Sequence, residues 1–190
     1  PALDVKSASR WGTSRLYYQP DTLKVALSYL EKGADKVEGT FAKNNLRYDL
    51  SDLRRQVLTD ECIPLLARIK ESYEDNDMDA FDDLSGKFLS RILELDEVLS
   101  VQPEMTYAYH AAMAESVCDE VKGTTAEDRE WMRWNLRTLI TTWGPELAAN
   151  AGGLGDYSNR EWSGMLRDYC YPRWKLFFEC LQKGEDTPSA

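Results

Sequence analysis

Residues 143–174 read WGPELAANAGGLGDYSNREWSGMLRDYCYPRW, and this segment gathers Trp, Tyr, Gly, Pro and paired charges as no other part of the chain does. Pro145 predicts the end of the preceding helix, because its ring removes a backbone N–H and restricts the residue before it. Glycines at positions 152, 153 and 155 indicate a loop, since they adopt backbone conformations that other residues avoid. Ser158 and Glu161 have the spacing of a capping box. The segment therefore predicts a loop followed by a new helix that begins at Ser158.

Trp143 and Tyr157 border this expected loop, and their role has two interpretations. In the first, both are core aromatics that hold the loop against the helices. In the second, they form a platform for a sugar, because flat aromatic rings bury the apolar C–H face of a pyranose. The Tyr157 hydroxyl or nearby Asn159 would then hydrogen-bond the rim of that sugar. The residues alone leave both interpretations open.

Apolar residues recur at helical spacing along most of the remaining chain. One stripe has steps of 4, 3 and 4 residues and consists of Leu46, Leu50, Leu53 and Val57. Such patterns predict helices over about 20–33, 41–73, 78–99, 104–123, 124–141 and 158–183. No segment shows the alternation of a β-strand. The predicted fold class is therefore all-α, a bundle of about six long, mostly antiparallel helices joined by short loops.

Prolines, capping residues and apolar faces refine this prediction. Pro64 and Pro172 fall inside two of the expected helices, so each predicts a kink, and Pro64 could instead split its helix. Thr124 and Glu127 form a second capping box that starts the helix over 124–141. The inward face of the helix over 104–123 is expected to carry Met105, Ala108, Ala112 and Val117. Four aromatic residues are expected to pack the bundle: Trp162, Trp174, Phe177 and Phe178.

Length, charge and cysteine usage bound the class of protein. The 190 residues predict a single all-helical domain spanning 1–190. With 23 basic against 33 acidic side chains the net charge is −10, which argues against a nucleic acid or an anionic membrane as partner. No apolar run approaches the roughly 18 residues of a membrane span. The four cysteines and the single His110 form no usual zinc set, so we expect no metal and no cofactor. Free buried thiols are the favoured interpretation, with a disulfide as the alternative.

Candidate catalytic groups have simpler explanations. The carboxylate pairs Asp82/Asp83, Glu94/Glu97 and Asp119/Glu120 fall mostly on polar faces of expected helices, and spacing along a helix does not place two carboxyl groups across a sugar-sized cleft. Asp52 and Arg55 form an ordinary i, i+3 pair. His110 lacks the elbow motif that would support a nucleophile. The glycine-rich loop lacks the Gly-Lys-Ser/Thr ending of a phosphate loop. We therefore expect no catalytic residue in this chain.

Several motifs nevertheless form a recognisable set. Within residues 143–174 they are Trp143-Gly-Pro, Asp156-Tyr157-x-Asn159, Trp162-x-Gly164 and Tyr171-Pro172-Arg173-Trp174. Upstream they are Arg47-Tyr48-Asp49-Leu50-x-Asp52-Leu53-x-Arg55-Gln56 and Leu95-Asp96-Glu97-Val98-Leu99. Together they make nearly the whole chain resemble the C-terminal helical domain of the α-N-acetylglucosaminidases, glycoside hydrolase family 89.

The resemblance implies an exo-acting hydrolase that removes terminal α-linked N-acetylglucosamine with retention of configuration. In that family a barrel domain carries two catalytic glutamates, and the helical domain packs on the barrel and closes one side of the sugar pocket. The resemblance implies that Trp143 and Tyr157 line that pocket, with Leu154 as a third substrate-binding residue. The implied partners are the catalytic barrel of the same polypeptide and a glycan with terminal α-linked N-acetylglucosamine.

The catalytic barrel is absent from this sequence, which begins at Pro1 without an initiator Met. We therefore expect the chain to be the C-terminal portion of a larger hydrolase and to be inactive by itself. Because no Asn-x-Ser/Thr acceptor occurs, an exported bacterial enzyme is favoured over a lysosomal one. The alternative function is a free-standing helical carbohydrate-binding or protein-interaction module without catalysis. A purely structural spacer would explain the core but not the aromatic residues that border the loop.

Overall fold

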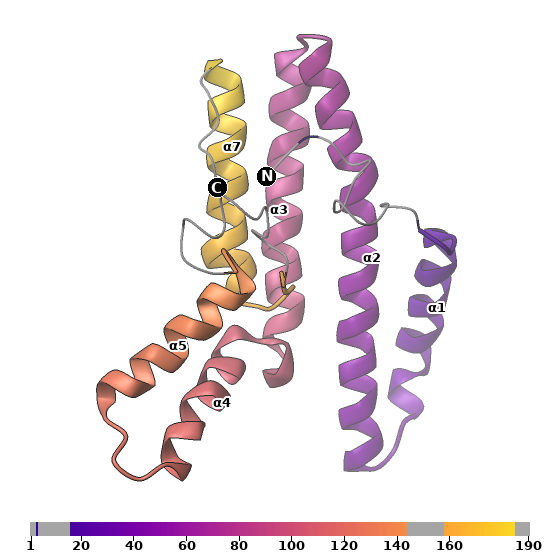
Figure 1. Ribbon diagram of the computed structural model, residues 1–190. Helices are drawn as coiled ribbons and strands as arrows, with labels where there is room; N and C mark the ends of the chain where they lie inside the picture. Colours follow the sequence, from indigo (N-terminus) through magenta and orange to yellow (C-terminus); the bar gives the residue numbers. More distant parts are fainter. Residues whose placement is uncertain (1–2, 4–15, 144–157, 185–190) are drawn as a thin grey trace.

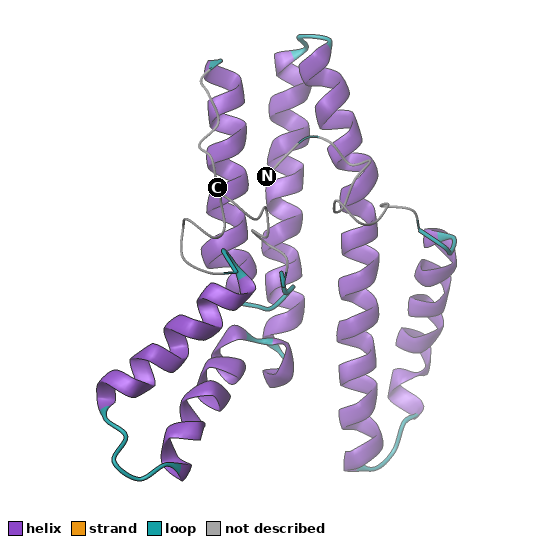
Figure 2. Cartoon of the chain, in the orientation of Figure 1, coloured by secondary structure: helices purple, strands orange, loops and turns teal. Residues whose placement is uncertain are grey.

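The computed structural model describes residue 3 and residues 16–143 and 158–184 of the chain. Within these residues the protein is all-α, as the sequence predicts (Figure 2). The α-helices of the described part are α1 (Pro20–Gly33), α2 (Thr40–Glu74), α3 (Met78–Ser100), α4 (Tyr107–Glu120), α5 (Ala126–Ile140) and α7 (Tyr171–Lys183). Short 3-10 turns cover Ala34–Lys36 and Pro103–Met105, and a π-helical segment, Leu166–Cys170, leads into α7.

The centre of the bundle is α3, which lies between α2 and α7 (Figure 1). Its buried apolar residues recur every three or four positions and therefore share one face, formed by Phe81, Leu84, Phe88, Ile92, Leu95 and Leu99. Phe178 of α7 packs edge-on against two of these rings, with centroids 5.8 Å from Phe81 and 5.9 Å from Phe88. Trp174 also meets Phe88, at 4.8 Å. Phe178 and Trp174 thus pack the bundle as predicted.

Two helices extend the bundle on opposite flanks. On one flank α1 lies against α2, and none of its residues is fully buried. On the other flank α4 and α5 pair with one another and diverge from the end of α3 (Figure 1). This pair brings the end of α5, where Trp143 follows, to the same part of the molecule as the start of α7.

Three local predictions were wrong. The last helix does not begin at Ser158: residues 158–162 are irregular, because their polar groups bind other elements, as described below. The capping box of α5 lies one residue later than predicted, since Thr125 Oγ1 accepts from the N–H of Asp128 at 3.2 Å and the Thr125 N–H donates to the Asp128 carboxylate at 2.6 Å. On α4 the buried residues are the small Ala111 and Cys118, whereas Ala108, Ala112 and Val117 are exposed.

The two prolines behave differently. Pro64 does not split α2, which runs continuously from Thr40 to Glu74 and changes direction along its course (Figure 1). Pro172 stands in the first turn of α7, where the missing N–H is tolerated. The π-helical segment Leu166–Cys170 comes directly before α7, so the chain enters the last helix through wide turns rather than regular α-helical ones.

Candidate functional site

Of the predicted substrate-binding residues, Trp143 is the one that the structure describes; Tyr157 and Leu154 lie outside the described residues. The backbone of Trp143 has φ 63°, in the left-handed region that residues other than Gly rarely adopt. Its N–H donates to the Thr138 carbonyl at 2.7 Å, which satisfies one of the open carbonyls at the end of α5. The indole is half-buried. Trp143 is thus fixed at one border of the predicted sugar loop.

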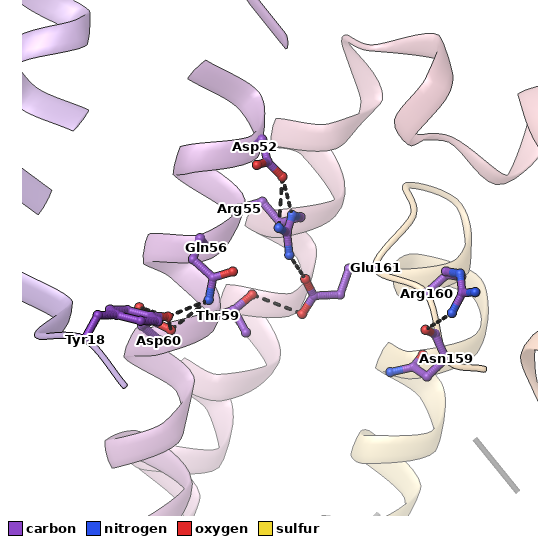
Figure 3. A network of polar contacts seen from close by, with 9 residues as sticks. All are labelled: Tyr18, Asp52, Arg55, Gln56, Thr59, Asp60, Asn159, Arg160 and Glu161. Atoms are coloured by element: carbon purple, nitrogen blue, oxygen red, sulfur yellow. Dashed lines mark hydrogen bonds and ion pairs between the residues drawn. The ribbon is translucent and has the colours of Figure 1, made fainter. Parts of the chain in front are cut away.

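The other border is fixed by residues 161–167, which we call the anchor segment. It begins four residues after Tyr157 in the sequence and leads into the last helix. The side chain of Glu161 reaches α2, where its two oxygens accept from Arg55 at 2.6 Å and from Thr59 at 3.0 Å (Figure 3). Burial opposes the Arg55 charge, but hydrogen bonds and charge from Glu161 and Asp52 outweigh it and raise the pKa of Arg55. Arg55 therefore stays charged at neutral pH.

The next contacts of the anchor segment converge on Asp96 of α3, which is only 2% exposed. One carboxylate oxygen accepts from the backbone N–H groups of Gly164 at 2.7 Å and Arg167 at 3.2 Å. The other accepts from the Ser163 hydroxyl at 3.3 Å and meets the Arg167 guanidinium at 3.0 Å. Asp96 thereby serves as an N-terminal cap supplied by a different helix, and its charge favours the positive end of the helix dipole.

The anchor segment is also held by the start of α4. The N–H of Ser163 donates to the Met105 carbonyl and the N–H of Tyr107 donates to the Ser163 carbonyl, both at 2.9 Å. Trp162 stacks on His110, with centroids 3.8 Å apart and planes 12° from parallel. A ring nitrogen of His110 lies 2.9 Å from the Glu104 carbonyl. His110 therefore has a structural role, because it packs against Trp162 and binds the chain just before α4.

A second polar cluster lies next to Arg55 on α2. Asp60, which is buried, accepts from the Tyr18 hydroxyl at 2.8 Å and from the Gln56 amide at 2.9 Å (Figure 3). Burial of Tyr18, with the hydrogen bond to Asp60 and its charge, raises the pKa of the Tyr18 phenol. These contacts attach the chain just before α1 to the middle of α2.

The described residues offer structural rather than catalytic chemistry. Asp60 and Asp96 are the buried carboxylates of the described ranges, and both accept hydrogen bonds from other groups of this chain. The four cysteines, all within the described residues, form no disulfide, in agreement with the favoured prediction, although Cys62 and Cys170 are only partly buried. Burial raises the pKa of Cys62 to about 11, so this thiol is a poor nucleophile at neutral pH. No group of three His, Cys, Asp or Glu side chains is placed to hold a metal ion within residues 16–143 and 158–184.

Sequence reasoning missed the two anchoring carboxylates. Asp96 carries a usable signal, because it lies four residues after Ile92 and three before Leu99 on the buried stripe of α3, where a charged residue needs a partner. Glu161 carries none: the capping-box pattern assigned it to a local contact, whereas its partner Arg55 is 106 residues away. The Asp52–Arg55 pair does form, at 2.9 Å.

We predict that Arg55 and Glu161 are energetically coupled. Their side chains are 26% and 28% exposed, so the pair is shielded enough for a double-mutant cycle with Arg55→Met and Glu161→Gln to give about 1 kcal/mol of coupling in urea unfolding. The matched control is Lys175 and Glu179, an exposed i, i+4 pair at 3.9 Å, for which a few tenths of a kcal/mol are expected. Equal coupling in the two cycles would contradict the anchoring role of Glu161.

The chain is similar to known proteins along its whole length. The sequence model of the family described as "Alpha-N-acetylglucosaminidase (NAGLU) C-terminal domain" matches residues 1–189. The human alpha-N-acetylglucosaminidase is 27% identical over 136 residues, which cover 71% of this chain and 17% of the human protein. None of the helices in the described part of the chain is both long and apolar enough to cross a lipid bilayer.

Solved structures of family 89 glycoside hydrolases are also similar to this chain. The family 89 glycoside hydrolase from Clostridium perfringens, in complex with PUGNAc, is 32% identical and superimposes with a TM-score of 0.87. The match covers 100% of this chain and 21% of that one. A second structure of the Clostridium enzyme, in complex with its substrate GlcNAc-alpha-1,4-galactose, is 31% identical with the same TM-score of 0.87. The chain therefore spans about a fifth of the length of these relatives.

Proposed function

We propose that this chain, which belongs to the family of α-N-acetylglucosaminidase C-terminal domains, is the C-terminal portion of an exo-acting glycoside hydrolase. That enzyme removes terminal α-linked N-acetylglucosamine with retention of configuration. Residues 1–190 form a single helical domain of that enzyme, which packs on a catalytic domain and lines one side of the sugar pocket. The observation that carries the proposal is the family match over residues 1–189.

The arrangement of the described residues supports this role. Trp143 and the anchor segment hold the two borders of the predicted sugar loop through contacts with α2, α3, α4 and α5. A loop that must present side chains to a ligand needs such rigid supports, because positioning residues act only when their own supports are fixed. Asp96 and Glu161, the carboxylates that support the anchor segment, bind donors of this chain. In the proposed enzyme the catalytic glutamates belong to the other domain, as the family resemblance implies.

In the proposed pocket Trp143 and Tyr157 pack against the apolar face of the terminal sugar, and Leu154 adds apolar contact. The substrate is a glycan with terminal α-linked N-acetylglucosamine, the sugar unit of the GlcNAc-alpha-1,4-galactose bound by the Clostridium enzyme. Because the sequence has no Asn-x-Ser/Thr acceptor, an exported bacterial enzyme that degrades glycans is favoured over a lysosomal one.

The full-length protein from the source tests the proposal. It should release the aryl group from an aryl α-N-acetylglucosaminide and leave the matched β-anomer intact, and NMR should show the α-anomer of the sugar as the first product. The 190-residue chain by itself should release none. The proposal would be wrong if the native polypeptide proved to be no larger than 21.8 kDa on an immunoblot, or if the 190-residue chain matched the rate of the full-length protein.

A further inference from the structure

Helix α5 has a clear inner face that packs on α4. Arg133 meets Glu115 of α4 at 2.8 Å, and Arg129 donates to the Glu115 carbonyl at 3.3 Å. Ile140, two turns after Arg133, is 5% exposed. These three positions lie within about 60° of one another around the helix, at 100° per residue. These residues therefore define the side of α5 that faces α4.

The opposite side of α5 carries two tryptophans. Trp131 and Trp134 stand one turn apart, are 57% and 44% exposed, and contact one another with ring centroids 5.3 Å apart at 81°. A shallow hollow surrounds them, and its remaining lining residues are Glu127, Glu130 and Arg137. The outer side of α5 is thus an indole pair inside a charged rim.

This composition is that of a protein interface rather than of a solvated helix face. A surface helix normally has one apolar side, and on α5 the half-buried Met132 and Leu136 with the buried Ile140 already form one. Leaving two indoles half exposed forgoes the burial of large apolar surfaces. Trp and Arg are also the residues that most often dominate binding energy at the centre of an interface, with polar groups around them. The pair therefore has the features of an anchor for another protein surface.

Two observations point to the occupant. The relatives in which this domain occurs are about five times its length, so a much larger protein surface is available to the domain within the same polypeptide. Helix α5 also ends at Ile140, only three residues before Trp143, the residue proposed to face the sugar, so the indole pair and Trp143 belong to one continuous segment of the chain. The other large exposed aromatics on the flanking helices already have partners: Tyr29 of α1 has the Lys32 ammonium over its ring at 5.7 Å, and Tyr109 of α4 meets the His110 ring edge-on at 5.3 Å.

We propose that Trp131 and Trp134 are the docking residues of α5 for the catalytic domain of the same polypeptide. This inference rests on the proposed function, and it adds the surface through which the two domains join. Docking at α5 would hold Trp143 against the catalytic pocket, since Trp143 follows the last residue of that helix by three positions. The outer side of α1, on the opposite flank of the bundle, would remain in solvent and supplies the control position (Figure 1).

The first test measures access in the full-length protein. Trp131→Cys and Tyr29→Cys are each treated with N-ethylmaleimide, and the labelling of the wild-type cysteines is subtracted. The thiol introduced by Trp131→Cys should react at least about tenfold more slowly than the one introduced by Tyr29→Cys, because a docked domain excludes the reagent. Equal rates would overturn the proposal. Protection that arises only when N-acetylglucosamine is added would overturn it too, in favour of a sugar subsite on α5.

A second variant covers the case in which Trp131→Cys itself separates the two domains and so exposes the new thiol. Trp134→Glu should lower kcat/KM of the full-length protein by at least about tenfold and split its calorimetric unfolding into two transitions, since a buried unpaired charge separates the domains. Tyr29→Glu should change neither. Wild-type behaviour of Trp134→Glu would overturn the docking proposal. A full-length protein without α-N-acetylglucosaminidase activity but with a protected Trp131→Cys thiol would reject the proposed function and leave the docking surface standing.

Discussion

Replacing Asp96 with alanine is expected to lower the free energy of unfolding by about 3 kcal/mol, the largest loss from any single polar side chain in the anchor region. The carboxylate is buried and accepts from Gly164, Ser163 and two groups of Arg167. Its removal leaves the backbone N–H of Gly164 without this partner, and a buried donor that loses its acceptor costs about 1–3 kcal/mol. The Arg167 guanidinium is 57% exposed and can regain water, so it adds little.

Thermal unfolding of the domain measures this loss. For a domain of this size the expected change corresponds to a fall in Tm of roughly 6–12 °C. Asp96→Asn should recover about half of it, because the amide oxygen still accepts from Gly164 while its NH2 cannot accept from Arg167. The control is Glu97→Ala, an exposed carboxylate on the same helix, which should stay within about 0.5 kcal/mol. A loss below 1 kcal/mol for Asp96→Ala would show that the anchor segment is held mainly by its backbone contacts with α4.

The helices could be predicted because apolar residues recur at helical spacing along the chain, and such a stripe marks the side of a helix that is buried. The buried face of α3 from Phe81 to Leu99 is such a stripe, with apolar residues three or four positions apart. The inner face of α4 could not be predicted this way, because small residues, Ala111 and Cys118, pack inward while the more apolar Val117 stays exposed. Size matters there more than hydropathy, and size requirements depend on the neighbouring helix rather than on the local sequence.

The anchor segment could not be predicted because its contacts are long-range. Ser158 and Glu161 have the spacing of a local capping box, yet Glu161 binds Arg55 and Thr59 of α2 instead. Asp96 supplies the cap that a local residue would otherwise provide, from 68 positions away in the sequence. Tertiary contacts of this kind leave no periodic pattern. The aromatic border of the loop was visible in the sequence, but only the family resemblance favours a sugar platform over a packed core at Trp143.

Trp143→Ala in the full-length protein is expected to reduce kcat/KM for an aryl α-N-acetylglucosaminide by about 30- to 100-fold. The ring removed would otherwise bury the apolar face of the terminal sugar, and losing the contact of one aromatic side chain costs about 2–3 kcal/mol. If the contact is equal in the bound substrate and the transition state, the loss falls on KM and kcat is retained. Trp143→Phe keeps a flat ring and should stay within about tenfold of the wild type.

The backbone of Trp143 allows the sugar contact to be separated from a packing role. Its φ of 63° strains any residue with a Cβ, so Trp143→Ala retains the strain and Trp143→Gly relieves it. Trp143→Gly should therefore unfold at a higher temperature than Trp143→Ala, while both lose the same activity. Thermal midpoints measured beside kcat/KM give the comparison. If activity followed stability instead, with Trp143→Gly close to the wild type in both, Trp143 would be a core aromatic that supports the loop, and the sugar platform would have to be formed without it.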